Sequence, residues 1–366
     1  MRHAHHLDGI RGVAAFLVVI GHIESFWGVF TSGTTMYSQK SAWWYYYNKL
    51  CNGNFYVCIF FALSGMVLIK GYSVLKKKEV LQKAFVKRYF RLTPIVLSSV
   101  VLAWLFSITI GFHSVGMSEL ISHHWLGKQY TREIYFLDVI YNGIIGVYQG
   151  NSVFNGPLWT IGIEFAGSLT LFLFAYMFFD RNNFHGISIA FCILLIITFQ
   201  TKGLYISLFI AGANIIRYDI RIHILFLLPS IYLGMMHPWT KEMVWIKTMF
   251  PQMPVSPDII SHAIAALLFI SAVQGSKFAI NFFGIKLFRW LGKISFCMYV
   301  YHVPVIMSIG CATFIYMVNS GYGHYSGIIA MLVSFLCIFV FSECGSKYID
   351  VPGQKLASVI AKKIIN

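Results

Sequence analysis

The chain has 366 residues, of which 58% are hydrophobic and only 11% are charged. Soluble domains carry about 25% charged residues, so this composition excludes a soluble domain and predicts an all-α bundle of membrane-spanning helices. The net charge of +15 does not indicate a nucleic acid partner, because the chain has no basic segment interleaved with aromatic residues.

The spacing of cysteines and histidines does not indicate a metal site. The 7 cysteines are scattered through apolar runs without a CxxC spacing, which is typical of small core residues. His3, His5 and His6 stand close together on an unanchored chain end, where an incidental cluster is the favoured interpretation. We therefore expect no metal cofactor and no disulfide framework.

Apolar runs long enough to cross a membrane recur along the chain. A helix needs roughly 17–25 predominantly apolar residues to span a bilayer. By that measure about ten candidate spans are present: 9–30, 55–72, 93–112, 158–179, 186–201, 203–216, 222–237, 258–275, 293–318 and 326–344. The segment 134–157 is also apolar, but Asp138, Asn142 and several glycines interrupt it. It fits an interfacial or re-entrant piece better than a full span.

Basic residues are distributed unevenly between the two sides of these spans. With the N-terminus in the cytosol, the cytosolic side carries about three times as many Lys and Arg residues as the outer side. This bias predicts that both termini are cytosolic, and it directs most of the positive charge at anionic lipids and ligands there. We divide the chain into a transmembrane domain at 1–345 and a short cytosolic amphipathic tail at 346–366.

The first predicted span carries two ionisable residues, Arg11 near its start and His22 deep inside. The separation of eleven residues makes about three helical turns, so both side chains lie on one face, about 16–17 Å apart along the axis. Ionisable groups are costly inside a bilayer, so this face is expected to line the bundle interior or a watery cavity. A packing histidine is the alternative, but the aligned Arg11 favours a reaction channel.

Two further features precede the third span. Ser64 is a hydroxyl inside the second span, where Gly65 follows it, and a packing role is favoured over a chemical one. Arg88 and Arg91 stand three residues apart, just before Pro94. They either anchor the chain on its cytosolic side or present two guanidinium groups to a cytosolic phosphate.

Polar side chains also occur in the fourth and ninth spans. Glu164 lies about 7–8 Å below the outer end of the fourth span, which Trp159 opens. Its carboxylate either pairs with a neighbouring helix or helps to position or deprotonate a hydroxyl. His302 is a second intramembrane histidine, with Tyr299 one turn before it, and a packing role is favoured there.

A series of segments resembles the acyltransferase-3 family in its order along nearly the whole chain. The segments are Arg11 with His22, Phe61-Ala62-Leu63-Ser64-Gly65, Arg88 with Arg91, Leu158-Trp159 with Glu164, and Leu291-Gly292 with Ser295, Tyr299 and His302. Members of this family are bacterial inner-membrane proteins of about ten helices that transfer acyl groups, mostly acetyl, to sugar hydroxyls. This chain departs from the family pattern at Ala166-Gly167-Ser168, where an aromatic pair is usual, and at Asp350, where a glutamate is usual.

The resemblance implies a multi-pass acyltransferase of the bacterial plasma membrane. It implies that an acyl group, expected to be acetyl, passes from cytosolic acetyl-CoA to a hydroxyl of a cell-envelope or secreted glycan or of a lipid-linked saccharide. The candidate residues are His22, Arg11 and Glu164 for catalysis, Arg88, Arg91 and Arg11 for the donor, and Trp159, Ser64, Tyr299 and His302 for the substrate. Glu164 is expected to orient His22 or the acceptor from the outer side.

Two questions stay open at this point. His22 acts either as a general base on the acceptor hydroxyl or as a transiently acylated nucleophile. The alternative function is a proton-coupled transporter or a flippase of a lipid-linked sugar, which would use the same polar face. The chain has no inverted repeat, and this counts against a transporter.

Overall fold

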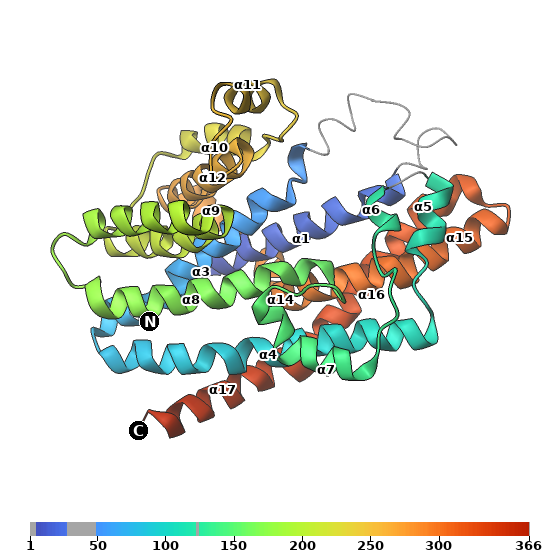
Figure 1. The fold of residues 1–366 in the computed structure, drawn as a ribbon, viewed down its shortest axis with the longest axis horizontal. Coiled ribbons are helices and arrows are strands. Elements are labelled where there is room, and N and C mark those ends of the chain that lie inside the picture. The colour runs from blue at the N-terminus through green and yellow to red at the C-terminus, as the bar shows by residue number, and fades with distance from the viewer. Residues whose placement is uncertain (1–4, 28–48, 122–123, 366) are drawn as a thin grey trace.

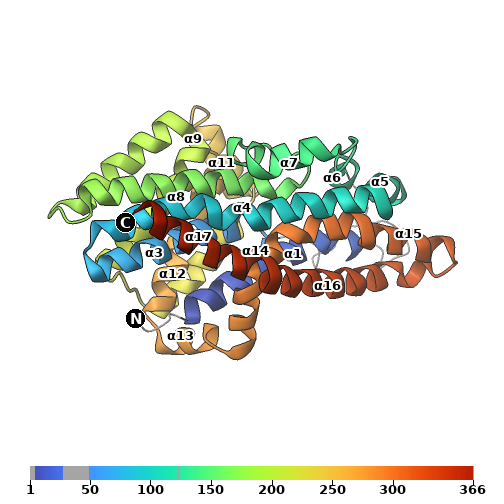
Figure 2. The same ribbon diagram turned by 90° about the horizontal axis from the view of Figure 1, so that it is seen from below.

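A computed structural model describes residues 5–27, 49–121 and 124–365, and within these ranges the chain forms helices and turns without a strand. The longer helices lie side by side as one bundle, with shorter helices at its ends and along its sides (Figures 1 and 2). They are α1 (His5–Trp27), α3 (Gly53–Leu75), α4 (Lys78–Thr109), α5 (Ser114–Ile121), α6 (His124–Gly127), α7 (Phe136–Ile144), α8 (Trp159–Phe178), α9 (Phe184–Arg217), α10 (Leu227–Gly234), α11 (Lys241–Met249), α12 (Pro257–Gln274), α13 (Lys277–Phe283), α14 (Lys286–Val305), α15 (Cys311–Asn319), α16 (Ser326–Gly345) and α17 (Val351–Ile364).

The predicted all-α membrane bundle is confirmed, while the predicted count of about ten spans is not. In the described part of the chain, 8 helical runs are long and apolar enough to cross a membrane. One of them, α9, breaks at Gln200 (φ 50°, ψ −125°), and the Ser207 hydroxyl donates to the carbonyl of Cys192 at 3.4 Å. The two halves of α9 therefore fold back on each other, and they match the separate runs predicted at 186–201 and 203–216.

The run at 222–237 is not a full span. Only Ile224–Gly234 forms an apolar helix there, and at 1.5 Å per residue it covers about 16 Å of a hydrocarbon core about 30 Å thick. Turns at residues 235–240 then lead into α11. Apolar composition alone therefore overestimated the length of this helix.

The segment predicted to be re-entrant enters the bundle instead of crossing it. Its residue Asn155 is fully buried, and its side-chain amide donates to the carbonyl of Val300 in α14 at 2.7 Å and to the Ser99 hydroxyl at 3.3 Å. Val300 lacks its usual helical donor because that position is Pro304, which has no backbone N–H. The re-entrant segment thus satisfies a carbonyl that a proline leaves without a partner in its own helix.

This contact predicts a stability effect. Replacing Asn155 with alanine removes the donor to the Val300 carbonyl and should lower the free energy of unfolding by about 1–3 kcal/mol, because a buried carbonyl is left without a hydrogen bond. Thermal unfolding in detergent checks this as a lower midpoint. Asn183→Ala, at an exposed asparagine, is the matched control. Equal midpoints for the two variants would contradict the assignment.

Small residues let α1 and α14 approach closely. A Cβ added at Gly12 would lie 2.3 Å from the backbone nitrogen of Gly292, and one at Gly292 would lie 2.2 Å from the carbonyl oxygen of Asp8. Both contacts are with backbone, which cannot move aside as a flexible side chain can. The two helices therefore touch along their backbones, as is common at helix crossings in membranes.

We expect Gly12→Ala to lower the free energy of unfolding by about 1–3 kcal/mol, because the added methyl group overpacks this crossing. Thermal unfolding in detergent is the measurement. Gly186→Ala in α9 is the control, since a Cβ there would have no atom within 4 Å. A control that loses as much stability as Gly12→Ala would show that the effect belongs to any helical glycine.

The C-terminal helix continues from α16 without a break. The π-helical turn Ser346–Asp350 joins α16 to α17, and Gly353 of α17 packs against Pro94 of α4. The boundary predicted at 345/346 falls inside this continuous run, and the division into a domain and a tail stays a prediction. The start of α1 and the end of α17 lie at the same end of the molecule in both views (Figures 1 and 2).

Candidate active site

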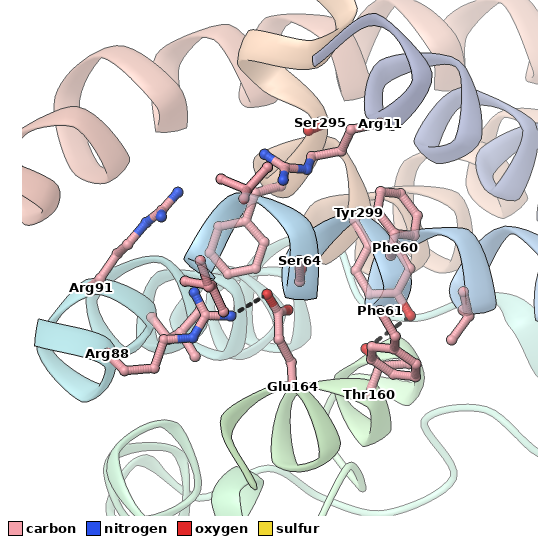
Figure 3. A pocket seen from close by; sticks show the side chains of 15 residues that line it. Arg11, Phe60, Phe61, Ser64, Arg88, Arg91, Thr160, Glu164, Ser295 and Tyr299 are labelled. Atoms are coloured by element: carbon pink, nitrogen blue, oxygen red, sulfur yellow. Dashed lines mark hydrogen bonds and ion pairs between the residues drawn. The ribbon is translucent and has the colours of Figure 1, made fainter. Parts of the chain in front are cut away.

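A narrow pocket of about 80 Å³ lies where α1, α3, α4, α8 and α14 meet (Figure 3). Among the residues that line it are six of the candidates from the sequence: Arg11, Ser64, Arg88, Arg91, Glu164 and Tyr299. The other three candidates, His22, Trp159 and His302, lie outside its lining. Residues far apart in the sequence therefore share one site.

Arg88 and Glu164 form an ion pair inside this site. The Nη2 atom of Arg88 lies 2.5 Å from Oε1 of Glu164, and its Nε donates to the Ser168 hydroxyl at 2.9 Å (Figure 3). The Arg88 side chain is only 5% exposed, against 23% for Glu164. Glu164 therefore pairs with an almost fully buried arginine of α4. Ser168 lies one turn after Glu164, in the segment 166–168, and its contact with Arg88 was not predictable because the two residues are far apart in the sequence.

Arg11 and Arg91 complete the charged part of the pocket. Their side chains extend toward each other from α1 and α4 (Figure 3). Asp8 interacts electrostatically with Arg11, and Glu164 and Asp350 interact with both arginines. With Arg88 already bonded to Glu164 and Ser168, the guanidinium groups of Arg11 and Arg91 are the ones that converge on the space. Such an arrangement suits an anion, and phosphate in particular.

Tyr299 and Phe60 line a different part of the pocket from the arginines. The Tyr299 hydroxyl donates to the carbonyl of Pro157 at 3.2 Å and accepts from the Thr160 hydroxyl at 3.1 Å. Its ring lies 5.9 Å from the ring of Phe60, measured between centroids. The pocket is thus charged on the side of α1 and α4 and aromatic with few hydroxyls toward the start of α8 (Figure 3).

The two intramembrane histidines contact each other next to Tyr299. His302 is fully buried, and its Nε2 lies 3.3 Å from Nδ1 of His22. The centroids of the two imidazole rings are 4.9 Å apart, and the Tyr299 ring is 5.9 Å from that of His302. The sequence placed each histidine inside a helix but did not predict this contact, which requires the crossing of α1 and α14.

The remaining candidate, Trp159, opens α8 beside the pocket residue Thr160. It is 37% exposed, and its ring lies 5.7 Å from the Tyr205 ring of α9. Within the described ranges no three His, Cys, Asp or Glu side chains are grouped so that they could hold a metal ion. The residues of the pocket and the histidine pair carry guanidinium, carboxylate, hydroxyl and imidazole groups.

The family model described as an acyltransferase domain, that of acyltransferase-3, matches residues 5–346, nearly the whole chain. The chain belongs to the acyltransferase-3 family. No curated protein and no solved structure matches it.

A membrane acyltransferase needs a donor, an acceptor and a surrounding lipid bilayer. In this acyltransferase, the family match covers every element that lines the pocket, from α1 to α14. It also includes the helices that carry the histidine pair. The pocket and the adjoining histidines are therefore its candidate active site.

Proposed function

We propose that this acyltransferase moves an acetyl group from cytosolic acetyl-CoA to a hydroxyl of a cell-envelope or secreted glycan, in the plasma membrane of a bacterium. The observation that carries the proposal is the convergence of Arg11 and Arg91 on a narrow pocket that leads toward Tyr299 and the histidine pair. An acyl-CoA carries anionic phosphate groups at one end and a reactive thioester carbonyl at the other.

The donor fits this pocket in one direction. The phosphate groups of the donor would bind Arg91 and Arg11, since guanidinium groups recognise phosphate through paired N–H donors. The pocket of about 80 Å³ is smaller than the pantetheine arm, so it would have to widen for the arm to enter, while the bulkier nucleotide would stay at the mouth. The arm would run past Ser64 and Ser295, which line the same space.

Two routes for the transfer use His22. In the direct route, the acceptor hydroxyl gives its proton to His22 while its oxygen attacks the thioester carbonyl, and the carbon–sulfur bond breaks. The CoA sulfur then takes that proton and leaves as the thiol. In the covalent route, the His22 imidazole attacks the thioester carbonyl, the carbon–sulfur bond breaks and CoA leaves as the thiolate. The acceptor hydroxyl then attacks the acetyl group, the carbon–nitrogen bond breaks, and the hydroxyl proton passes to the CoA thiolate. Both routes balance without a metal or a redox partner.

The remaining candidates are assigned by their surroundings. Glu164 would hold the Arg88 guanidinium in place through their ion pair, and Arg88 would add positive charge near the donor phosphates. On the acceptor side, the exposed ring of Trp159 offers an apolar face of the kind that packs against sugar rings. The Tyr299 hydroxyl and Ser64 line the space where a saccharide hydroxyl would meet the thioester.

Calorimetric titration of the detergent-purified protein with acetyl-CoA and with free CoA tests the proposal. We expect binding in about the micromolar range for both, and binding at least about tenfold weaker for Arg91→Ala, because a charge-assisted hydrogen bond contributes about 1.5–3 kcal/mol. Lys277→Ala removes the same charge at an exposed cytosolic-side lysine and is the matched control. An absence of binding to folded wild-type protein would refute the acyl-CoA donor.

A further inference from the structure

In the hydrogen bond between His22 and His302, the positions of the ring protons show which ring donates and which accepts. His302 Nδ1 lies 2.7 Å from the carbonyl oxygen of Tyr299, and His22 Nδ1 lies 2.9 Å from that of Val18. A carbonyl oxygen can only accept a hydrogen bond, so each ring carries a proton on Nδ1. Neutral His302 then has its lone pair on Nε2, the atom that faces His22 Nδ1 at 3.3 Å.

We propose that His302 is a positioning residue that accepts the Nδ1–H of His22 together with Val18, and so strengthens the preference for the tautomer in which His22 Nε2 carries the lone pair. This inference rests on the function proposed above, in which His22 takes up a proton or an acyl group. The Nδ1–H of His22 is shared between Val18 and His302, one partner in its own helix and one in α14. The second partner also sets the rotation of the ring.

The hydrogen bond between His22 and His302 is similar to those that orient catalytic and metal-bound histidines. There, a second group accepts the Nδ1 proton, which fixes the tautomer and increases the basicity of Nε2. A carboxylate usually has this role, but a neutral imidazole performs it here without placing a further charge among apolar helices. Two charged imidazoles with centroids 4.9 Å apart would repel each other, so at most one ring of the pair is protonated at a time.

The surroundings of His302 make it a fixed acceptor. It is fully buried, and its own Nδ1 is anchored to the Tyr299 carbonyl one turn earlier. On the C-terminal side of His302, Pro304 leads into the π-helical turn Ile306–Gly310. On its N-terminal side, the Asn155 amide donates to the carbonyl of Val300. A side chain held in this way can orient His22 on the neighbouring helix.

Two isosteric substitutions separate orientation from simple packing. In His302→Gln, the side-chain amide reaches the position of Nε2 and can still accept from His22. In His302→Asn, the amide reaches only the position of Nδ1, so it keeps the Tyr299 contact and loses His22. We expect His302→Asn to lower kcat for acetyl transfer by about 10–100-fold with KM for acetyl-CoA unchanged, and His302→Gln to stay within a few-fold of wild type. Equal losses in kcat for the two variants, or a change in KM alone, would overturn the proposal.

A spectroscopic measurement tests the same contact without relying on activity. Nitrogen NMR of protein labelled with ¹⁵N-histidine reports which ring nitrogen carries the proton, and comparison with His22→Gln identifies the His22 signals. We expect mainly the tautomer with unprotonated Nε2 in the wild type and in His302→Gln, and a larger share of the other tautomer in His302→Asn, where residue 302 no longer accepts beside Val18. An unchanged share of the two tautomers in His302→Asn, or a mainly protonated Nε2 in neutral wild-type His22, refutes the positioning role. If the wild-type protein shows this tautomer but transfers no acetyl group, the proposed function fails and the histidine contact stands.

Discussion

His22→Ala is expected to reduce acetyl transfer from acetyl-CoA by about 10²–10⁴-fold, the range typical of losing a general acid–base group. The reason is that both routes for the transfer pass the proton or the acyl group through this imidazole. The measurement is the rate of acetyl transfer in membranes or in detergent, together with the unfolding midpoint, so that loss of fold is separated from loss of chemistry.

The control for this prediction is His324→Ala, which removes an exposed histidine near the start of α16. It should leave the transfer rate within about twofold of wild type, because surface substitutions of this kind have small effects. A His22→Ala variant that is folded and transfers acetyl at the wild-type rate would rule out both routes. The pocket would then need another group to take the proton.

The second large effect concerns the buried ion pair between Arg88 and Glu164. Glu164→Leu leaves the almost fully buried Arg88 without its counter-charge, and we expect a loss of about 3–5 kcal/mol in the free energy of unfolding. Arg88→Leu should cost less, because the side chain of Glu164 is 23% exposed and water can solvate part of its charge. The double variant, with both charges gone, should recover stability to within about 1–2 kcal/mol of wild type, since paired hydrophobic replacements are often neutral.

The activity of the double variant separates the structural role of the pair from its chemical role. A stable double variant that no longer binds acetyl-CoA would assign Arg88 to the donor site, as we propose. Glu343→Leu is the matched control, because it removes one member of an exposed pair in which Lys293 lies 2.7 Å away, and exposed pairs contribute about 0–1 kcal/mol. If Glu164→Leu costs no more stability than this control, the pair is not buried as the structure places it.

Some of the site could be predicted from residues close in the sequence. Arg11 and His22 share a helix, so the period of 3.6 residues alone places them on one face, and the structure puts Arg11 in the pocket and His22 beside His302. The interrupted pattern of 134–157 likewise indicated a segment that does not cross the membrane. The contact between the Asn155 amide and Val300 was not predictable, because no residue near Asn155 in the sequence indicates that this segment lies beside α14.

The contacts that give the site its chemistry join residues distant in the chain. Arg88 and Glu164 are 76 residues apart, and His22 and His302 are 280 residues apart. For Arg88 and His302 the sequence left packing or anchoring as an alternative to a functional role. Their partners depend on which helices abut, and that is decided by close backbone approaches such as the one between Gly12 and Gly292.

The sequence by itself determined the membrane class, the all-α fold and the polar face of the first helix, because composition and helical period are local properties of the chain. The family followed from the resemblance of motifs in their order along the chain. Only the tertiary structure decided that Glu164 pairs with Arg88, that Arg11 and Arg91 face one pocket and that His302 accepts from His22. The physical reason is that an apolar helix is compatible with many neighbours in a bilayer. Small residues, a proline and buried polar groups select one of them through packing and hydrogen bonds.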